Sequence, residues 1–570
     1  MQPVNVPIPD DLPGRNQILM ERCKILGDAV YSDPMGLVIR PNVDASKVDR
    51  WGFDAVQSSA WYAVSLARWC KDHPDNGAEE RRKLNRLLCA MCAQQDRKSD
   101  SATYGNIVWR WGWEDVKDRN GVSFWSPEAG YIYTNHRDLL DKETERALTE
   151  TLALCVEGLD RHRPRWQYTN IFLLNILSRL TIARALDRQD VLEQAEEDWQ
   201  TWFTETDRGG LTEYNSPTYI VTALAPLARM LDLTPDGGMR RQIETILGNL
   251  YADFCWHYHP ETGLLAGAMS RAYSGDWLRN SLSNSLAYQQ FGAPLMAVNL
   301  VSPFVALSNY QAPPECIRYA TEPKAGVTVR AAIPDSRIRR LTHFGKRYAL
   351  GVKSGPAYGP QELALTLAHP AKRQPLLFLR QQPETRAPLY AEMVENGLLC
   401  GLVFRDPPKY GGSPHNWAKL HVGYPDDFER IEINGVPWNG DYAAIVNDTH
   451  LRLVTSAITA DFRFGFDPLN TSGSPAQCVA YLWHQYEHDH VMLDIVAWGP
   501  TLAALALSVT EDGPPQPPGR IARHGASISA VLPAGETTVT IPEDDRAPLP
   551  EEIPLLEAPG VVWRRGSWGR

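Results

Sequence analysis

The chain has 570 residues, a formal net charge of −11 and 43% hydrophobic residues. A chain of this length is too long for one ordinary core and should divide into two or three domains. The acidic balance argues against nucleic acid or an anionic membrane as the main partner, although a local basic cleft could still hold an anionic substrate. The nine cysteines lack the dense spacing of a disulfide scaffold, which excludes a small stapled fold.

The N-terminal segment lacks the marks of a targeting sequence. Residues 1–10 have neither the basic region nor the apolar region of a secretory signal. No segment offers the roughly 20 consecutive apolar residues that a membrane-spanning helix needs. We therefore expect a soluble, cytoplasmic protein, with homo-oligomerisation left open.

The first half of the sequence has the pattern of helices separated by polar, glycine-containing connections. Apolar residues recur at three- and four-residue spacing, which is typical of helices that bury one face. The predicted helices include Ala55–Asp72, Glu79–Gln95, Lys142–Asp160, Asn170–Leu186, Gln189–Glu205, Ile220–Leu231 and Met239–His257.

Around residue 320 the pattern changes to short runs rich in Val, Leu, Phe and Tyr, divided by Pro, Gly and Asp. Closely spaced strands without intervening helices indicate antiparallel sheets, and we expect these sheets to form a sandwich. The predicted strands are Gly326–Ile333, Arg347–Lys353, Glu362–Leu367, Pro375–Arg380, Gly397–Arg405, Ala418–Tyr424, Phe428–Ile433, Leu451–Thr455, Cys478–Trp483, Val491–Ala497, Leu502–Val509 and Ser527–Leu532.

Many helices followed by a large all-β region is the layout of an (α/α) helical toroid joined to an antiparallel β-sandwich. We therefore predict an α+β multidomain fold. Its parts are a toroid that carries the catalytic site over residues 1–315, a sandwich over 316–545 and a proline-rich surface tail over 546–570.

Residues 207–219, DRGGLTEYNSPTY, place an unusual density of polar groups directly before a predicted helix. Glu213, Tyr214, Asn215 and Tyr219 can donate, accept or shuttle protons, and an ordinary helix connection needs none of them. The segment predicts an active-site loop.

A second motif, Trp166-Gln-Tyr-Thr-Asn170, precedes another predicted helix. Together with the layout of the chain, the two motifs resemble polysaccharide lyases of the heparinase II/III and alginate lyase type. In that family one helix opens with Asn, often Asn-His, and a later loop carries a glycine turn, an acidic residue, Ser-Pro and Tyr. This chain departs from the pattern at Ile171, which stands where the Asn-His version has its histidine. An imidazole must therefore come from elsewhere or be absent.

The resemblance implies β-elimination on a glycan that contains uronic acid. The reaction removes the proton beside the uronate carboxylate, and negative charge builds up on that carboxylate. Asn170, with an Arg or His nearby, is expected to stabilise this charge in the manner of an oxyanion hole. Tyr219 is expected to take the proton and then to protonate the leaving oxygen. A tyrosine ordinarily has a pKa of about 10 and so needs a cation beside it. No metal or other cofactor is required.

The segment 270–277, SRAYSGDW, offers partners for these groups. Arg271 is the candidate cation, Tyr273 an alternative acid and Asp276 an orienting acceptor that also contacts substrate. His257, and less directly His259, could supply the missing imidazole, or could cap the last carbonyls of a helix.

Further residues are candidates for substrate binding. Glu213, Tyr214 and Asn215 could bind sugar hydroxyls or orient the phenol of the loop. Flat aromatic faces stack on sugar rings, but they also pack between helix ends. The aromatic candidates are Trp109, Trp111, Trp113 and Trp166, and His415 is the one candidate in the sandwich.

Other interpretations stay open. Asn170 could be only a helix N-cap and Tyr219 a core aromatic. A helical toroid also supports inverting glycoside hydrolases, whose two carboxylates stand about 6.5–9.5 Å apart, and Glu213 with Asp276 would be that pair. A third interpretation is a non-catalytic carbohydrate-binding protein. A structural metal could be held by three histidines of a segment that could equally be a polar hairpin turn: His484, His488 and His490.

Overall fold

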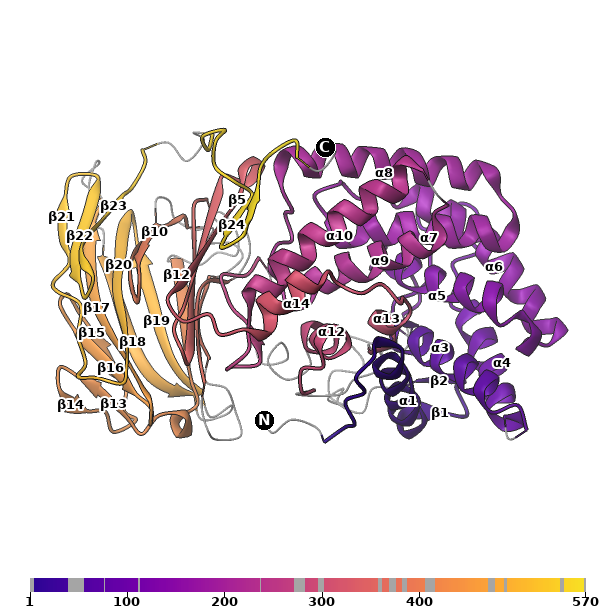
Figure 1. Ribbon diagram of the computed structural model, residues 1–570, viewed down its shortest axis with the longest axis horizontal. Helices are drawn as coiled ribbons and strands as arrows, with labels where there is room; N and C mark the ends of the chain where they lie inside the picture. Colours follow the sequence, from indigo (N-terminus) through magenta and orange to yellow (C-terminus); the bar gives the residue numbers. More distant parts are fainter. Residues whose placement is uncertain are drawn as a thin grey trace.

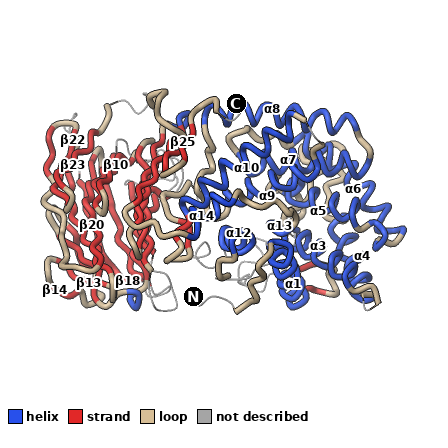
Figure 2. Tube along the Cα trace, in the orientation of Figure 1, coloured by secondary structure: helices blue, strands red, loops and turns tan. Residues whose placement is uncertain are grey.

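A computed structural model describes residues 5–38, 56–75, 77–110, 113–235, 237–270, 282–295, 302–356, 361–368, 376–381, 387–404, 416–469, 477–485, 490–543 and 548–567. A helical domain lies beside a domain of antiparallel sheets (Figure 1, Figure 2). The predicted α+β multidomain fold is confirmed. In the described part of the chain, no helix is long and apolar enough to cross a membrane.

The helices form two layers around a ring. Helices α1, α3, α5, α7, α9 and α12 each pack against the next, and α12 closes the ring by packing against α1. Helices α4, α6, α8, α10 and α14 lie outside them. The bounds are α1 Leu12–Val30, α3 Val56–Asp72, α4 Ala78–Cys92, α5 Gly121–Asn135, α6 Lys142–Arg161, α7 Thr169–Leu186, α8 Gln189–Gly209, α9 Tyr219–Leu233, α10 Gly238–His257, α12 Leu282–Phe291, α13 Ser302–Ala306 and α14 Pro314–Thr321.

The sequence explains which helices are inner and which are outer. Helix α7 is apolar around most of its circumference and is buried over nearly its whole length. Helix α8 carries acidic residues on one face and buries a stripe that includes Trp199 and Trp202 on the other. A helix that is apolar all round belongs in the interior, whereas an amphipathic one covers it.

Neighbouring inner helices α5 and α7 run in the same direction. Ser123 near the start of α5 donates a hydrogen bond to Asn175. Further along, a Cβ built on Gly130 would come within 2.9 Å of the Thr181 side chain. Because the two helices are parallel, their N-terminal ends lie at the same end of the ring.

Two large antiparallel sheets enclose the core of the second domain. The smaller has the order β10-β11-β20-β17-β16-β13-β14 and the larger β15-β18-β19-β12-β9-β8-β7-β6-β5-β24-β25. Leu350, Leu398, Leu420 and Leu507 are among the buried residues between them. A third sheet, β21-β22-β23, packs on the outer face of the smaller sheet.

The strands of the larger sheet are β5 Val327–Ile333, β6 Ile338–Phe344, β7 Tyr348–Ser354, β8 Gln361–Leu367, β9 Leu376–Gln381, β12 Asn416–Gly423, β15 Ala443–Ile445, β18 Gln477–Gln485, β19 His490–Trp498, β24 Leu556–Ala558 and β25 Val561–Trp563. Those of the smaller sheet are β10 Leu389–Val394, β11 Gly397–Phe404, β13 Arg430–Ile433, β14 Val436–Pro437, β16 His450–Val454, β17 Ile458–Pro468 and β20 Thr501–Glu511. The remaining strands are β1 Tyr31–Ser32, β2 Leu37–Val38, β3 Tyr258–His259, β4 Leu264–Leu265, β21 Ala522–His524, β22 Ser527–Leu532 and β23 Gly535–Thr540.

The stretch for which the sequence predicts a surface tail contains part of the larger sheet. Strand β24 pairs with β5, where Leu556 stands opposite Ala331, and β25 pairs with β24. The chain then returns to the helical domain, since the Gly566 N–H donates to the Asp207 carbonyl at 3.3 Å.

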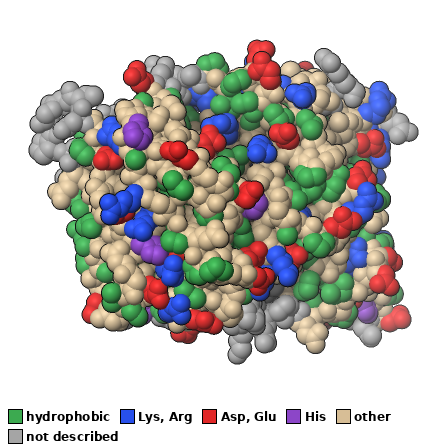
Figure 3. Space-filling view, turned by 60° about the vertical axis from the view of Figure 1, so that its left-hand side comes forward, with side chains coloured by type: hydrophobic (Ala, Val, Ile, Leu, Met, Phe, Trp, Pro, Cys, Tyr) green, Lys and Arg blue, Asp and Glu red, His purple; other side chains and the backbone are tan. Residues whose placement is uncertain are grey.

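Acidic and basic side chains are interspersed on the face that Figure 3 presents. That face holds no extended area of one sign, which fits a protein whose acidic charge is spread over its surface.

Candidate active site

Asn170 lies in the first turn of α7, at the end of the ring that faces the sheets. The N-cap of this helix is Tyr168, so Asn170 is not itself the capping residue. Its side chain is buried, and its Oδ1 has no hydrogen-bond partner among the described residues. A buried amide oxygen without a partner is costly, and such groups often serve function.

Glu213 fixes the predicted active-site loop to α7. The Asn170 backbone N–H donates to Glu213 Oε2 at 2.8 Å, and the glutamate is only 3% exposed. Thr212 donates from its hydroxyl to the Gln167 carbonyl. A carboxylate at a helix N-terminus satisfies a free N–H and interacts favourably with the helix dipole. The loop therefore has a defined position beside Asn170.

Tyr219 is the first residue of α9, which packs against α7. The Tyr219 backbone N–H donates to Ser216 Oγ at 3.1 Å, so the serine closes the turn before the helix. Residues 211–217 are buried, whereas Tyr219 is half-buried. Its placement keeps the residue at the solvent boundary of the ring.

Tyr214 and Asn215 point into protein. The Asn215 backbone has φ of 39°, in the left-handed region that Asn tolerates. Its side-chain amide donates to the carbonyls of Ala266 at 2.6 Å and Ala268 at 2.9 Å. Ser270 Oγ donates to the Tyr214 carbonyl at 2.7 Å. The loop is thus anchored to residues 266–270, and Tyr214 and Asn215 are buried.

A buried set of polar side chains connects this loop to the sheets. The Arg340 guanidinium of β6 lies 4.8 Å from the centre of the Tyr214 ring. Its Nη2 is 3.3 Å from both carboxylate oxygens of Asp253 in α10. His257 Nδ1 is 3.0 Å from Asp253 Oδ1. Within the described chain, Nε and Nη1 of Arg340 have no hydrogen-bond partner.

The charges in this set determine the state of Asp253. Burial alone would raise the pKa of its carboxyl, but Arg340 and His257 together hold that pKa well below its usual range. Asp253 is therefore an anion that neutralises the arginine across the boundary between the two domains.

The two histidines near the end of α10 are both buried. His257 Nδ1 lies 2.8 Å from the Asp253 carbonyl oxygen, so the residue also satisfies the last turn of the helix. His259 contacts Thr262 Oγ1 through Nδ1 at 3.2 Å, and burial lowers the pKa of its imidazole to about 3. His257 belongs to the buried polar set, and His259 stands apart from it.

Lys324 closes the C-terminal end of α10. Its Nζ donates to the carbonyls of Cys255 at 2.6 Å and Trp256 at 2.9 Å, and also to that of Tyr258. Burial lowers the pKa of this ammonium to about 7. The lysine replaces the missing next turn of the helix and so holds the end that carries His257.

The described candidate tryptophans take part in packing. Trp109 and Trp166 are partly buried against the helical core. Trp109 meets Phe124 edge to face, with ring centroids 5.0 Å apart. The Trp113 ring has the Arg110 guanidinium at 5.7 Å and the Lys117 ammonium at 5.3 Å.

Several predicted residues lie outside the described ranges: Trp111, Arg271, Tyr273, Asp276, His415 and His488. Of the other two candidate metal ligands, His490 packs against the Tyr424 ring at 4.4 Å, and His484 lies in β18. No group of three or more His, Cys, Asp or Glu side chains in the described part of the chain could hold a metal ion.

Sequence reasoning missed Asp253 and Arg340. Asp253 stands four residues before His257 in a predicted helix, a spacing that places both side chains on one face, so a signal was present. Arg340 is 87 residues further along the chain, and no local pattern connects it to them.

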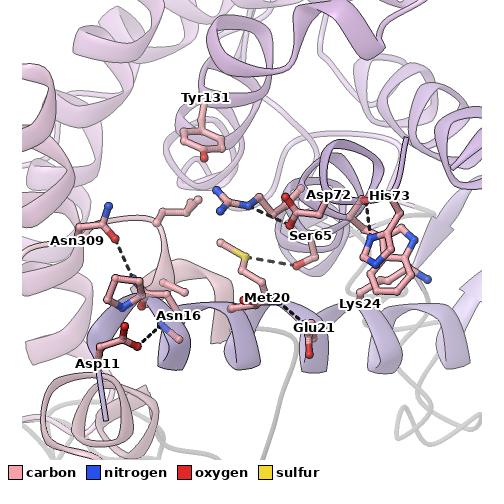
Figure 4. A pocket seen from close by; sticks show the side chains of 17 residues that line it. Asp11, Asn16, Met20, Glu21, Lys24, Ser65, Asp72, His73, Tyr131 and Asn309 are labelled. Carbon is pink, nitrogen blue, oxygen red and sulfur yellow. Dashed lines mark hydrogen bonds and ion pairs between the residues drawn. The ribbon is translucent and has the colours of Figure 1, made fainter. Parts of the chain in front are cut away.

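A separate cavity of about 510 Å³ lies near the C-terminal end of α5. Helices α1 and α3 line it with Asn16, Met20 and Trp69, and Tyr131 of α5 directs its hydroxyl into it (Figure 4). Arg184 of α7 and Asp232 of α9 line a neighbouring cavity together with Tyr131, so the C-terminal ends of α5, α7 and α9 lie together. Asn170 and Tyr219, at the N-terminal ends of α7 and α9, therefore lie at the opposite end of the ring.

Comparisons with known proteins give distant matches. A family model described as "Domain of unknown function (DUF8769)" matches residues 17–292, and no curated protein matches the chain. The chain is similar to the chondroitin AC lyase of Streptomyces coelicolor A3 in complex with chondroitin sulphate, at 10% identity and a TM-score of 0.46, over 93% of this chain and 85% of the lyase. It is also similar to heparinase III, the BT4657 gene product, at 10% identity and a TM-score of 0.39, over 94% and 92%. Endoglucanase CelQ from Clostridium thermocellum with cellotetraose follows at 9% identity and a TM-score of 0.29, over 88% and 93%. These similarities are too distant to transfer functional residues.

Proposed function

We propose that the protein is a carbohydrate-active enzyme, a lyase that cleaves glycans containing uronic acid by β-elimination. The observation that carries the proposal is the 2.8 Å hydrogen bond between Glu213 and the Asn170 backbone. It fixes the loop that leads to Tyr219 against the helix turn that carries the Asn170 amide. An amide and a phenol therefore belong to one end of the ring, on neighbouring parallel helices.

These groups suit the reaction. The Asn170 amide, near the positive end of the α7 dipole, would donate to the uronate carboxylate and stabilise the charge that develops there. Tyr219, as phenolate, would take the proton from the adjacent carbon. The electron pair left behind forms a carbon–carbon double bond as the glycosidic carbon–oxygen bond breaks. The phenol then returns its proton to the leaving oxygen.

A phenolate at Tyr219 needs a positive charge beside it. Arg340 stacks on the ring of Tyr214, five residues before Tyr219, but Asp253 compensates its charge. A second cation is therefore needed beside the reacting phenol, and Arg271 remains our candidate for it. We also propose His257 as a positioning residue, since its Nδ1 lies 3.0 Å from the Asp253 carboxylate that pairs with Arg340.

The hydrolase alternative is less well supported. It requires Glu213 as a general acid or base, with Asp276 as its partner. The Glu213 carboxylate is buried and already accepts a hydrogen bond from the Asn170 backbone. A carboxylate in that position serves the loop and the helix end, which leaves it poorly placed for proton exchange with a sugar.

Product chemistry tests the proposal. The protein is incubated with chondroitin sulphate, heparin and alginate, while ultraviolet absorbance of unsaturated uronate and the release of reducing ends are followed together. Elimination raises both signals. Reducing ends without absorbance would establish hydrolysis, and neither signal with any of the three polymers would refute the proposed activity on them.

Tyr219→Phe is the matched variant, because it removes one hydroxyl from a half-buried ring. We expect turnover to be lost while the melting temperature stays near that of the wild type. Full activity of Tyr219→Phe would remove this residue from the mechanism.

A further inference from the structure

One face of the larger sheet runs from the candidate site to the far edge of the sandwich. Thr342 of β6 donates to the Gly267 carbonyl at 2.7 Å, so this face lies against the segment that anchors the active-site loop. Directly paired residues of antiparallel strands share a face. The row of direct pairs is Thr342, Gly351, Ala364, Phe378, His421, Met492 and Trp483.

The far end of this face carries aromatic side chains. Tyr481 lies two residues before Trp483 in β18, on the same face. Its ring stacks on that of Tyr442, with centroids 4.8 Å apart and planes 26° apart. Tyr442 is 66% exposed, the most exposed large apolar or aromatic side chain of the described chain. In this stack Tyr442 covers one face of the Tyr481 ring and is itself exposed to solvent.

Charged side chains continue the surface toward the candidate site. Asp494 of β19 stands directly opposite Tyr481 on one side and Lys419 of β12 on the other. Lys419 Nζ is 3.8 Å from Asp494 Oδ2 and 5.0 Å from the centre of the Trp417 ring. The lysine side chain is 34% exposed and the aspartate 23%. The ammonium is thus the more accessible charge.

We define the aromatic platform as Trp417, Lys419, Tyr442, Tyr481, Trp483 and Asp494, and we propose that it binds an acidic glycan chain at a site separate from the candidate active site. Sugar rings would stack on Tyr442, which Tyr481 supports from below, and on Trp483, and a uronate carboxylate would meet Lys419. The choice of an acidic glycan rests on the proposed function, since the platform shares its face with that site.

Physical features of the platform favour this ligand. Aromatic faces with polar groups at their edges bind the apolar faces of sugars while the edges bind hydroxyls. Burial raises the pKa of Asp494, while Lys419 and a hydrogen bond from Trp483 oppose that shift.

The platform lies far from the candidate active site. From β6 to β18 there are six strand spacings, which amounts to about 29 Å. A chain of several sugars could reach from the platform to the active site, whereas a disaccharide could not.

The test separates binding from turnover. Binding of chondroitin sulphate, heparin and alginate is measured by affinity electrophoresis on the full chain with Tyr219→Phe, which keeps the polymers intact. The platform variant adds Tyr442→Ala and Tyr481→Ala, and the matched variant replaces both tyrosines by Phe, which retains the rings. Val531→Ala, on a residue 60% exposed in β22 of the third sheet, controls for surface changes elsewhere.

We expect the Ala pair to weaken binding of at least one polymer by about tenfold, and the Phe pair to keep it within about twofold. Lys419→Met should weaken the same binding and reduce its dependence on salt. Equal binding by the Ala pair and the parent, or no binding by the parent, would overturn the platform. Made in the chain that keeps Tyr219, the same two Ala substitutions should leave turnover of short oligosaccharides unchanged. If the wild type shows no elimination but the Ala pair loses binding, the platform stands and the proposed enzyme activity fails.

Discussion

The Asn170 backbone N–H donates to Glu213 Oε2 at 2.8 Å, and this bond joins the start of α7 to the loop before α9. Glu213→Ala removes the acceptor from a buried helix end. We expect a loss of about 0.5–2 kcal/mol in the free energy of unfolding, as for other capping groups. Urea denaturation measures it.

Glu213→Gln is the control for charge, since its amide oxygen can still accept the bond. It should lose less stability than Glu213→Ala and should keep measurable elimination activity. Complete loss of activity in Glu213→Gln, at normal stability, would instead favour an acid–base role for this residue.

Asn170→Ala distinguishes the role of the Asn170 side chain from that of its backbone N–H. The backbone hydrogen bond to Glu213 remains, so the melting temperature should change little. If the amide stabilises the developing charge as a single oxyanion donor does, kcat should fall by about 10²–10³-fold, or about 2.7–4 kcal/mol. Steady-state kinetics on a cleaved polymer measures this. A lower melting temperature with normal kcat would make the residue purely structural.

The buried pair of Arg340 and Asp253 should show strong coupling. Replacing one partner leaves the other charge buried and unpaired, so Arg340→Met or Asp253→Asn alone should cost about 3–5 kcal/mol. The double variant should cost clearly less than the sum of the two. Denaturation of all four proteins completes the cycle. Additive losses would mean that the two side chains act independently.

Close packing between the domains leaves no room for a side chain at Gly351. A Cβ built there would come within 1.8 Å of the Gly267 carbonyl oxygen, and that atom belongs to backbone that cannot move away freely. We expect Gly351→Ala to cost about 1–3 kcal/mol.

Gly248 in α10 is the matched control, because nothing lies within 4 Å of a Cβ built on it. Gly248→Ala should stabilise the protein by about 0.5–1 kcal/mol, the usual helix preference for alanine. Equal melting temperatures of the two variants would contradict the close contact at Gly351.

Lys324 should make stability depend on pH above neutrality. Burial lowers the pKa of its ammonium to about 7 in the folded protein, while the unfolded chain has an ordinary lysine. Above pH 7 the folded protein therefore binds fewer protons than the unfolded chain, and stability rises with pH until the ordinary lysine pKa is reached. Relative to Lys324→Met, the free energy of unfolding should rise by up to about 1.4 kcal/mol per pH unit between pH 7 and 9. Parallel curves for the two proteins would show that the folded ammonium keeps its proton.

Local periodicity predicted the helices well because each is encoded by its own residues. The predicted Asn170–Leu186, Ile220–Leu231 and Met239–His257 differ from α7, α9 and α10 by at most two residues at either end. Strand β6 was missed because its sequence, IRRLTHF, has two adjacent arginines that argue against a buried strand. One of them, Arg340, is buried only because Asp253 lies opposite it in the other domain.

The same distinction applies to the site. The loop around Tyr219 and the helix start at Asn170 are short motifs, and the sequence alone predicted that each carries polar chemistry. That Tyr214 and Asn215 turn inward could not be predicted, because their partners are Arg340 and the carbonyls of Ala266 and Ala268.

The Arg340–Asp253 pair also affects whether the helical domain could be expressed without the sheet domain. A shortened polypeptide that stopped between α14 and β5 would keep the Asp253 carboxylate and lose both the guanidinium that compensates it and the sheet that covers this end of the helices. Such a fragment should express poorly, and a foreign sheet fused in its place would have to bring its own arginine to that spot.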